Sequence, residues 1–180
     1  KLSRDKDVYV SLADRTNAAN AWGADLYFSI HVNGHTNINA NGYEDFTYLS
    51  VPQETSDTRK AIHAKLSAVW FNADRANRGM KTANFQVLRE TRMAAVLVEN
   101  GFITNPQDAG LLKNESFRQD LAEAMAAGIA EALGLKKKET QSTFILGLPQ
   151  ATVAQAQEWA RSRRAHQRFI DIAPVYWQIG

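Results

Sequence analysis

Residues 25–33 (DLYFSIHVN) form an apolar, β-prone run that carries a histidine close to its end. A helical pattern precedes this run, and a segment rich in asparagine and glycine follows it. The arrangement predicts a strand buried on both faces of a largely parallel sheet. His31 would then lie near the carboxyl end of the strand, where open α/β sheets place their ligands. For an isolated Ile-His pair, a histidine that merely opens a turn is the alternative.

A second apolar run, at residues 94–103 (AAVLVENGFI), also leads into an ionisable side chain, Glu99. A carboxylate at the end of a buried strand costs several kcal/mol unless it meets a cation, a metal or water. Since the ends of parallel strands meet at one edge of a sheet, we expect His31 and Glu99 to share a site.

The remaining pattern alternates helices and strands, which predicts an α/β fold with a mostly parallel twisted sheet flanked by helices on both faces. We expect helices that begin at Ser11, at Thr55 or Ser56, and at Ser116, where Gln119 completes a capping box. Gly23 and Gly134 are expected to end the first and last of these helices. Predicted strands cover residues 42–49, 85–89 and 95–99, and residues 74–84 are expected to form a polar loop.

Two acidic residues in the 42–49 strand place it near a sheet edge in this prediction. The 85–89 and 95–99 strands are too close for an intervening helix, so we expect them to pair directly. Arg78-Gly79 in the polar loop is a guanidinium beside a flexible backbone, which suits contact with a carboxylate or carbonyl. A surface arginine beside a turn glycine is the alternative.

The other histidines are weaker candidates for a metal site. His35 follows His31 by four residues, a spacing that suits a metal on one helix, but Asn33-Gly34 breaks any helix between them. We therefore expect His35 to be a solvated loop residue, or one that approaches substrate, rather than a metal ligand. His63 adjoins the apolar face of the second predicted helix, and we expect a structural role for it.

Composition limits the class of protein. The 180 residues are 44% hydrophobic and 22% charged, enough for one sizeable core, and the absence of cysteine excludes disulfides, thiolate zinc sites and thiol nucleophiles. The sequence contains neither an 18-residue apolar run nor a recognisable signal peptide. Residues 1–135 contain 14 Lys and Arg against 16 Asp and Glu, whereas residues 136–180 contain 7 against 3. This shift marks a domain boundary better than it marks a nucleic-acid site.

Several short blocks, in their order and spacing over roughly residues 1–134, resemble the zinc-dependent N-acetylmuramoyl-L-alanine amidases of the bacterial cell wall. The blocks are SRDKD at 3–7, LADR at 12–15, AN at 19–20, AD at 24–25, SIHVN at 29–33, NRG at 77–79, VLR at 87–89 and LVENGF at 97–102.

The resemblance implies a zinc ion held by a histidine in a Gly-rich loop, by a glutamate, and by the histidine that corresponds to His31. The first two ligands have no counterpart in this sequence, and we expect them in a segment that precedes Lys1. Residues 1–135 would then be a partial amidase domain that lacks its first strands, and the chain alone should be inactive.

The resemblance also implies roles for three more residues. Glu99 would take a proton from zinc-activated water and pass it to the departing amine, while Asn33 and Arg78 position the substrate. The bond cleaved would be the amide between the lactyl group of N-acetylmuramic acid and L-alanine of the stem peptide.

We expect a linker at residues 136–150 and the start of a second helical domain at 151–180, because residues 150–177 are faintly similar to the opening of glucosaminidase-type domains. The expected partner is peptidoglycan, with no nucleic acid and no membrane, and the expected state is a monomer. Action outside the cell, in the wall, or as a phage lysin is expected. The alternatives are a non-catalytic wall-binding or regulatory module and a zinc carboxypeptidase of similar fold.

Overall fold

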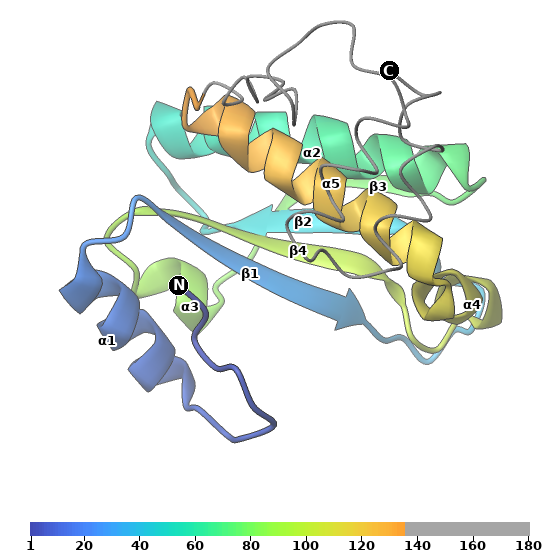
Figure 1. Ribbon diagram of the computed structural model, residues 1–180, viewed down its shortest axis with the longest axis horizontal. Helices are drawn as coiled ribbons and strands as arrows, with labels where there is room; N and C mark the ends of the chain where they lie inside the picture. Colours follow the sequence, from blue (N-terminus) through green and yellow to red (C-terminus); the bar gives the residue numbers. More distant parts are fainter. Residues whose placement is uncertain (136–180) are drawn as a thin grey trace, which may run out of the picture. The chain divides into compact units, whose positions relative to one another are not determined.

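The computed structural model describes residues 1–135, which form a four-stranded sheet with helices on both faces (Figure 1). The elements, in chain order, are α1 (Leu12–Trp22), β1 (Leu26–Asn33), β2 (Tyr43–Thr47), α2 (Gln53–Asn72), β3 (Asn77–Thr82), α3 (Gln86–Arg89), β4 (Ala94–Phe102), α4 (Pro106–Lys113) and α5 (Glu115–Ala132). The expected linker at 136–150 and second domain at 151–180 lie outside the described residues.

The sheet has the strand order β1-β4-β2-β3. Strand β1 runs parallel to β4 and β2 runs parallel to β3, whereas β2 and β4 are antiparallel. Two of the three pairings are thus parallel, and the predicted α/β class with a mostly parallel sheet is confirmed. The central pair β4–β2 joins the two parallel pairs into one mixed sheet.

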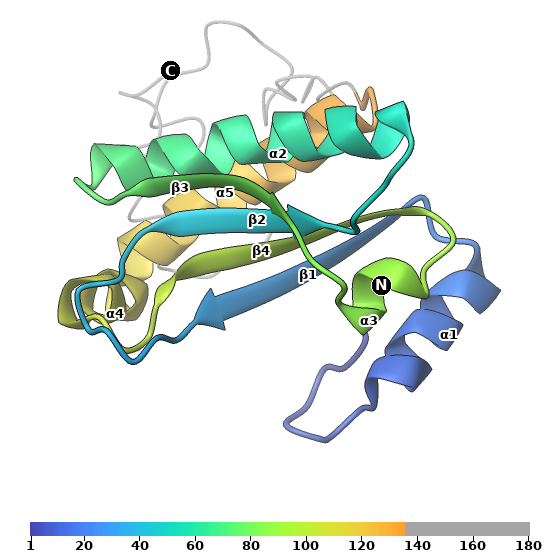
Figure 2. The ribbon, with the colours of Figure 1, turned by 180° about the vertical axis from the view of Figure 1, so that it is seen from behind.

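Helices α2 and α5 cover one face of the sheet (Figures 1 and 2). Their apolar side chains pack with inward-facing residues of β2 and β4, and the core here is led by Trp70, Tyr43, Ile62, Leu66, Val96 and Val98, all fully buried. Trp70 meets Phe117 of α5 edge-on, with the ring centroids 5.0 Å apart. The core on this face is the larger of the two, and its close packing fixes how β2 and β4 lie relative to each other.

Helices α1 and α3 lie on the opposite face (Figure 1). A second core there joins Val87 and Leu88 of α3 to Ala95 and Leu97 of β4, with Tyr27 of β1 packed against it. This core lies toward the start of β1 and β4. On the same face, the positions near the carboxyl ends of β1 and β4 lie beyond this core and are occupied by polar residues.

Helix α1 begins and ends as predicted. The Ser11 hydroxyl accepts a hydrogen bond from the Asp14 amide, and Gly23 closes the helix with a left-handed backbone at φ 67°. The predicted stop of the last helix is also confirmed, since Gly134 has φ 62° just after α5.

The prediction that residues 25–33 are buried on both faces is wrong. Strand β1 pairs only with β4 and lies at the edge of the described sheet, and Ile30, His31 and Val32 near its end are exposed. Ile30 and Val32 project to the α2–α5 face and His31 to the α1–α3 face, so neither layer of helices buries the carboxyl end of this edge strand.

Two short segments differ from the predicted secondary structure. Residues 86–89 form helix α3 rather than a strand, because Val87 and Leu88 are both buried and adjacent residues cannot share one face of a strand. The expected pairing of 85–89 with the next strand therefore does not exist. The predicted loop at 74–84 contains β3, whose backbone pairs with the free edge of β2 although the segment has little apolar character.

The helix starts also differ from prediction at two places. Pro52, not Thr55 or Ser56, precedes α2, and no side chain caps that helix. Helix α5 is capped by Asn114, whose side chain accepts from the Phe117 amide, because the short helix α4 ends immediately before it. The capping box of Ser116 and Gln119 is therefore not formed.

Strand β2 lies inside the sheet between β4 and β3, contrary to the prediction that its acids mark an edge. Asp45 is fully buried and bound by Arg59, His63 and Tyr43 from the α2 side. Glu44 is buried on the opposite side of the strand. Both carboxylates have cationic partners, which is why the interior position is tolerated.

Candidate active site

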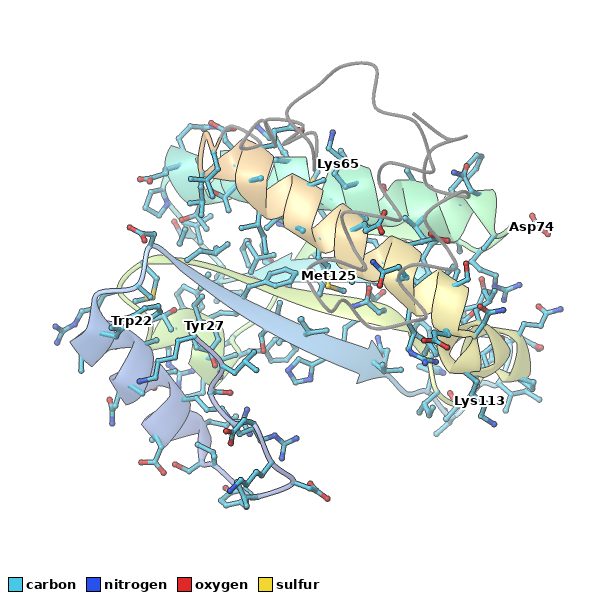
Figure 3. All side chains as sticks on the ribbon, in the orientation of Figure 1. Trp22, Tyr27, Lys65, Asp74, Lys113 and Met125 are labelled. Atoms are coloured by element: carbon cyan, nitrogen blue, oxygen red, sulfur yellow. The ribbon has the colours of Figure 1, made fainter. Side chains whose placement is uncertain are left out.

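Three ionisable side chains lie in one row across the sheet. His31 of β1 is in register with Glu99 of β4, and Glu99 is in register with Glu44 of β2. Residues in register on adjacent strands project to the same face, with Cβ atoms about 5 Å apart. By strand alternation Tyr27, labelled in Figure 3, projects to this same face of β1. The predicted meeting of His31 and Glu99 is present.

His31 is exposed at the edge of the row. Its Nε2 atom lies 3.0 Å from the Ser29 hydroxyl, a residue two positions earlier on the same face. The ring packs partly against the sheet although one side stays accessible, and this partial loss of solvation, and then the charge of Arg15, lower the pKa of His31. The imidazole is thus biased toward its neutral form, which is the form that binds metals or accepts protons.

Glu99 is the group in the middle of the row. Its Oε2 atom is buried and has no hydrogen-bond partner among the described residues. Burial, and then the charge of Glu44, raise the pKa of Glu99 to about 7. A carboxyl group with a pKa near neutrality and an unpartnered oxygen is suited to proton transfer.

Glu44 is 5% exposed and accepts hydrogen bonds from three residues on two other strands. Asn33 donates to Oε1 at 2.8 Å, while Arg78 at 2.7 Å and Lys81 at 2.5 Å both donate to Oε2. Burial opposes the charged form, yet the hydrogen bonds from Lys81 and Arg78 lower the pKa of Glu44 overall. Glu44 and Glu99 thus face each other with opposite tendencies to ionise.

Arg78 and Asn33, the two residues predicted to contact substrate, meet through Glu44. The guanidinium carbon of Arg78 also lies 4.9 Å from the centroid of the Phe102 ring, which holds the side chain over the end of β4. Sequence reasoning missed Glu44 and Lys81. In the sequence Glu44 has the character of an exposed edge residue and Lys81 lies in a polar segment, and only the pairing of β2 with β3 brings the two side chains together.

The other two histidines do not join the row. His35 is exposed, and its Nδ1 atom accepts from the backbone amide of Asn37 at 2.9 Å, as suits a loop residue. His63 lies on the α2 face with Nδ1 2.5 Å from the Asp45 carboxylate. Asp45 is fully buried, which agrees with the expected structural role, and Nε2 of His63 lies 3.2 Å from the side-chain nitrogen of the exposed Asn77.

The described residues do not by themselves fit a zinc ion. Within residues 1–135, no three His, Cys, Asp or Glu side chains are grouped so that they could hold a metal. Glu99 lies beside His31, but Glu44 is already bound to Arg78, Lys81 and Asn33. Protein zinc sites usually draw three or four ligands from the chain, and His31 is one matching ligand here.

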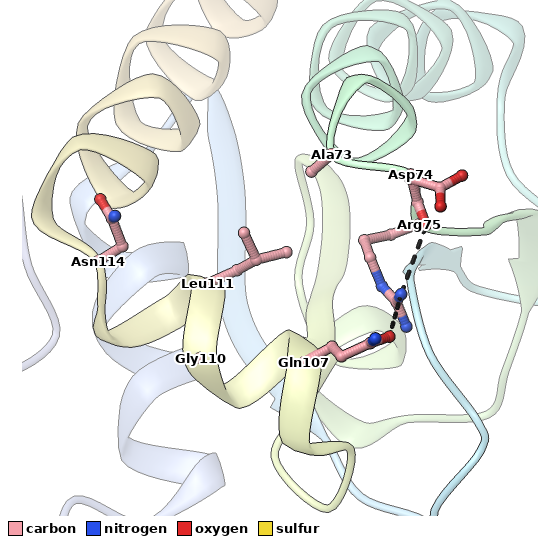
Figure 4. A pocket seen from close by; sticks show the side chains of 7 residues that line it. All are labelled: Ala73, Asp74, Arg75, Gln107, Gly110, Leu111 and Asn114. Atoms are coloured by element: carbon pink, nitrogen blue, oxygen red, sulfur yellow. Dashed lines mark hydrogen bonds between the residues drawn. The ribbon is translucent and has the colours of Figure 1, made fainter.

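Two cavities of the described residues lie away from this row. Figure 4 shows one of about 440 Å³ between the end of α2 and α4, where Arg75 donates to Gln107 at 2.6 Å. Another, of about 820 Å³, lies between the starts of β4 and α2 and the end of α5. Neither is lined by His31, Glu99 or Glu44, so the chemistry is assigned to the row rather than to a cavity.

A histidine and a carboxyl group of raised pKa lie side by side on two parallel strands of a helix-flanked mixed sheet, which defines an α/β protein with a candidate site for proton transfer. Comparison with known proteins identifies the family. A family model described as N-acetylmuramoyl-L-alanine amidase matches residues 1–131. The chain belongs to this N-acetylmuramoyl-L-alanine amidase family.

Individual relatives agree with this assignment. The chain is 48% identical over 144 residues to a sporulation-specific N-acetylmuramoyl-L-alanine amidase of Bacillus subtilis, covering 79% of this chain and 54% of that protein. It is 44% identical over 140 residues to an endolysin of Bacillus phage SPP1, covering 77% and 51%. The chain therefore spans about half the length of these relatives.

The fold also matches solved structures. The crystal structure of an N-acetylmuramoyl-L-alanine amidase from Clostridium difficile 630 superimposes with a TM-score of 0.68 at 32% identity, covering 75% of this chain and 72% of that one. The expected family and fold are confirmed. Within the described residues, no helix combines the length and apolar character needed to cross a bilayer.

Proposed function

We propose that the protein of which these residues form part hydrolyses the amide bond between the lactyl group of N-acetylmuramic acid and L-alanine in peptidoglycan. The observation that carries this proposal is Glu99, a half-buried carboxyl group with a pKa raised to about 7 and one buried oxygen that has no hydrogen-bond partner among the described residues, in register with His31. Family membership and the names of the relatives support the choice of bond.

Glu99 acts as the general base. It takes a proton from the attacking water as the water oxygen bonds to the lactyl carbonyl carbon, and it returns this proton to the alanine nitrogen as the carbon–nitrogen bond breaks. The products are a lactyl carboxylic acid and a peptide with a free amino terminus. A pKa near 7 lets one group accept and donate the same proton at neutral pH.

His31 serves as one zinc ligand in this proposal, and the other ligands of the family pattern come from outside residues 1–135. Its lowered pKa keeps the imidazole neutral and its exposed position leaves it open to a metal. Asn33 and Arg78 position the substrate from either side of Glu44. The protein works in the cell wall.

The test is digestion of purified peptidoglycan by a longer protein that contains this chain together with its upstream segment. Muramoyl lactyl carboxyl groups and amino-terminal L-alanine should appear together and in equal amounts. Release of amino acids from the carboxyl end of the stem peptide would indicate a carboxypeptidase instead. Wall binding without new termini would indicate a non-catalytic module.

A further inference from the structure

Two cations share one buried carboxylate beside the proposed catalytic base. Arg78 and Lys81, both on β3, donate to the same Oε2 atom of Glu44. Glu44 contributes one negative charge and the two side chains contribute two positive charges. The group therefore retains a net positive charge on the face of the sheet that carries Glu99.

The donors on both cations are only partly used. Arg78 binds Glu44 through Nε, and among residues 1–135 its two terminal nitrogens make no hydrogen bond. Lys81 makes a single hydrogen bond, also to Glu44, which leaves two ammonium protons. The side chains are 33% and 39% exposed, so both remain partly accessible to a ligand.

Further contacts hold the Glu44 carboxylate and the Arg78 guanidinium. Glu44 is held from the other side by Asn33, and the Phe102 ring supports the Arg78 guanidinium. Cations that are already ordered lose little side-chain entropy when they bind a ligand, in contrast to free surface lysines. Because Glu44 lies opposite Glu99, a ligand that reaches Arg78 and Lys81 also lies next to the proposed base.

We propose that Arg78 and Lys81, held by Glu44, form a carboxylate-binding pair that recognises a free carboxyl group on the stem peptide, just after L-alanine. This inference rests on the proposed function. In the uncleaved substrate the lactyl carboxyl group is part of the scissile amide and carries no charge. The anionic groups next to the scissile bond therefore belong to the stem peptide. Planar carboxylates suit the free edge of a guanidinium assisted by an ammonium group.

Binding to small ligands tests the pair without requiring hydrolysis. One ligand is an N-acetylmuramoyl-L-alanyl-glutamate with free carboxyl groups, and the other is the same compound with these groups converted into carboxamides. Dissociation constants are measured by NMR titration on the 180-residue chain. We expect the free acid to bind about three- to tenfold more tightly than the amide, as is typical of charge-assisted contacts at a partly exposed site.

Lys81→Gln should bring the two dissociation constants together, and Lys81→Arg should restore the difference because it keeps the charge. Lys60→Gln is the matched control, since it removes the same charge from an exposed position on α2, on the other face of the sheet. Unchanged amide spectra away from β3 show that each variant is folded. Equal binding of acid and amide by the unmodified chain, or no binding of either, overturns the inference.

N-acetylmuramic acid with a free lactyl group separates substrate from product recognition. If it binds as tightly as the free-acid peptide, the pair recognises the cleaved lactyl group and the inference fails. The outcome is also separable from the proposed function. If the longer protein hydrolyses wall but the chain does not prefer the free acid, only the proposed carboxylate-binding pair is contradicted. If the chain prefers the free acid but the longer protein does not hydrolyse wall, only the proposed activity is contradicted.

Discussion

Glu99 and Glu44 lie directly opposite each other on the antiparallel strands β4 and β2, yet their surroundings differ completely. Glu44 is neutralised by two cations and an amide, whereas Glu99 has one oxygen with no partner. One carboxyl group is therefore kept ionised and the other is pushed toward protonation, the arrangement that separates a structural carboxylate from a proton-transfer group.

The stability of the metal-free chain should fall as Glu99 ionises. Its folded pKa of about 7 exceeds the ordinary value of 4.5, so between these pH values the folded protein keeps a proton that the unfolded chain releases. Stability contributed by the protonated form is lost as pH rises through this window. Glu99→Gln should stabilise the protein by on the order of 1–3 kcal/mol at about pH 8, and by much less at about pH 4.

Urea unfolding in the presence of a chelator measures this difference. Glu54→Gln, which neutralises an exposed carboxyl group on α2, is the control and should show no comparable pH dependence. An equal effect of Glu99→Gln at both pH values would show that the carboxyl group ionises normally.

Glu44 should behave in the opposite way. Because its folded pKa is lowered, its ionised form contributes stability above the unfolded pKa, and this contribution is lost as pH falls through the folded pKa. Glu44→Gln should destabilise the chain at neutral pH by about 1–3 kcal/mol and flatten the acid side of the stability profile. Chemical denaturation between about pH 3 and 7 measures this profile. If the loss of stability at acid pH were the same in Glu44→Gln and in the unmodified chain, the pairing of Glu44 with Arg78 and Lys81 would be contradicted.

Asp45 and Arg59 form the buried ion pair of the opposite face, with Nε 2.6 Å from the carboxylate. Asp45→Ala should destabilise the protein by about 3–5 kcal/mol, because it leaves the Arg59 charge buried without a partner. Asp57→Ala, which breaks the exposed pair with Lys60, should have little effect. Comparable midpoints for these two variants in thermal unfolding would refute the structural role of the buried pair.

Gly101 lies where β4 bends past the main core, with φ at 74°. A Cβ atom there would overlap the Trp70 ring, which is fully buried and cannot move away. Gly101→Ala should lower the free energy of unfolding by about 3 kcal/mol or more. Gly134→Ala should lower it by about 1 kcal/mol, because Gly134 also has a positive φ but a Cβ atom there would meet no neighbouring atom. Similar losses of unfolding free energy would show that only backbone strain matters.

The sequence predicts the parts of the site that lie on strongly apolar strands. Residues 94–103 and 25–33 are apolar runs that end on ionisable groups, and the register of β1 with β4 brings His31 and Glu99 together as expected. Helix α1 was also predictable, because Ser11 and Gly23 act through contacts within a few residues.

The remaining parts depend on contacts between distant segments. Strand β3 has few apolar residues and forms because β2 offers an open edge, a property that local sequence does not reveal. The partners of Glu44 lie 34 and 37 residues further along the chain, on that same missed strand. From the sequence alone, Glu44 cannot be distinguished from an exposed edge residue, because its cationic partners Arg78 and Lys81 are distant in the chain.

The measurement that tests the central claim most directly is wall hydrolysis by the longer protein with Glu99 replaced by Gln. Zinc content, determined by mass spectrometry, should be unchanged, because Glu99 acts as the base rather than as a metal ligand in this account. The rate at which amino-terminal L-alanine appears should fall by at least about a hundredfold, since the amide keeps the shape and loses the base. Turnover close to that of the unmodified protein, with zinc still bound, would remove Glu99 from the mechanism.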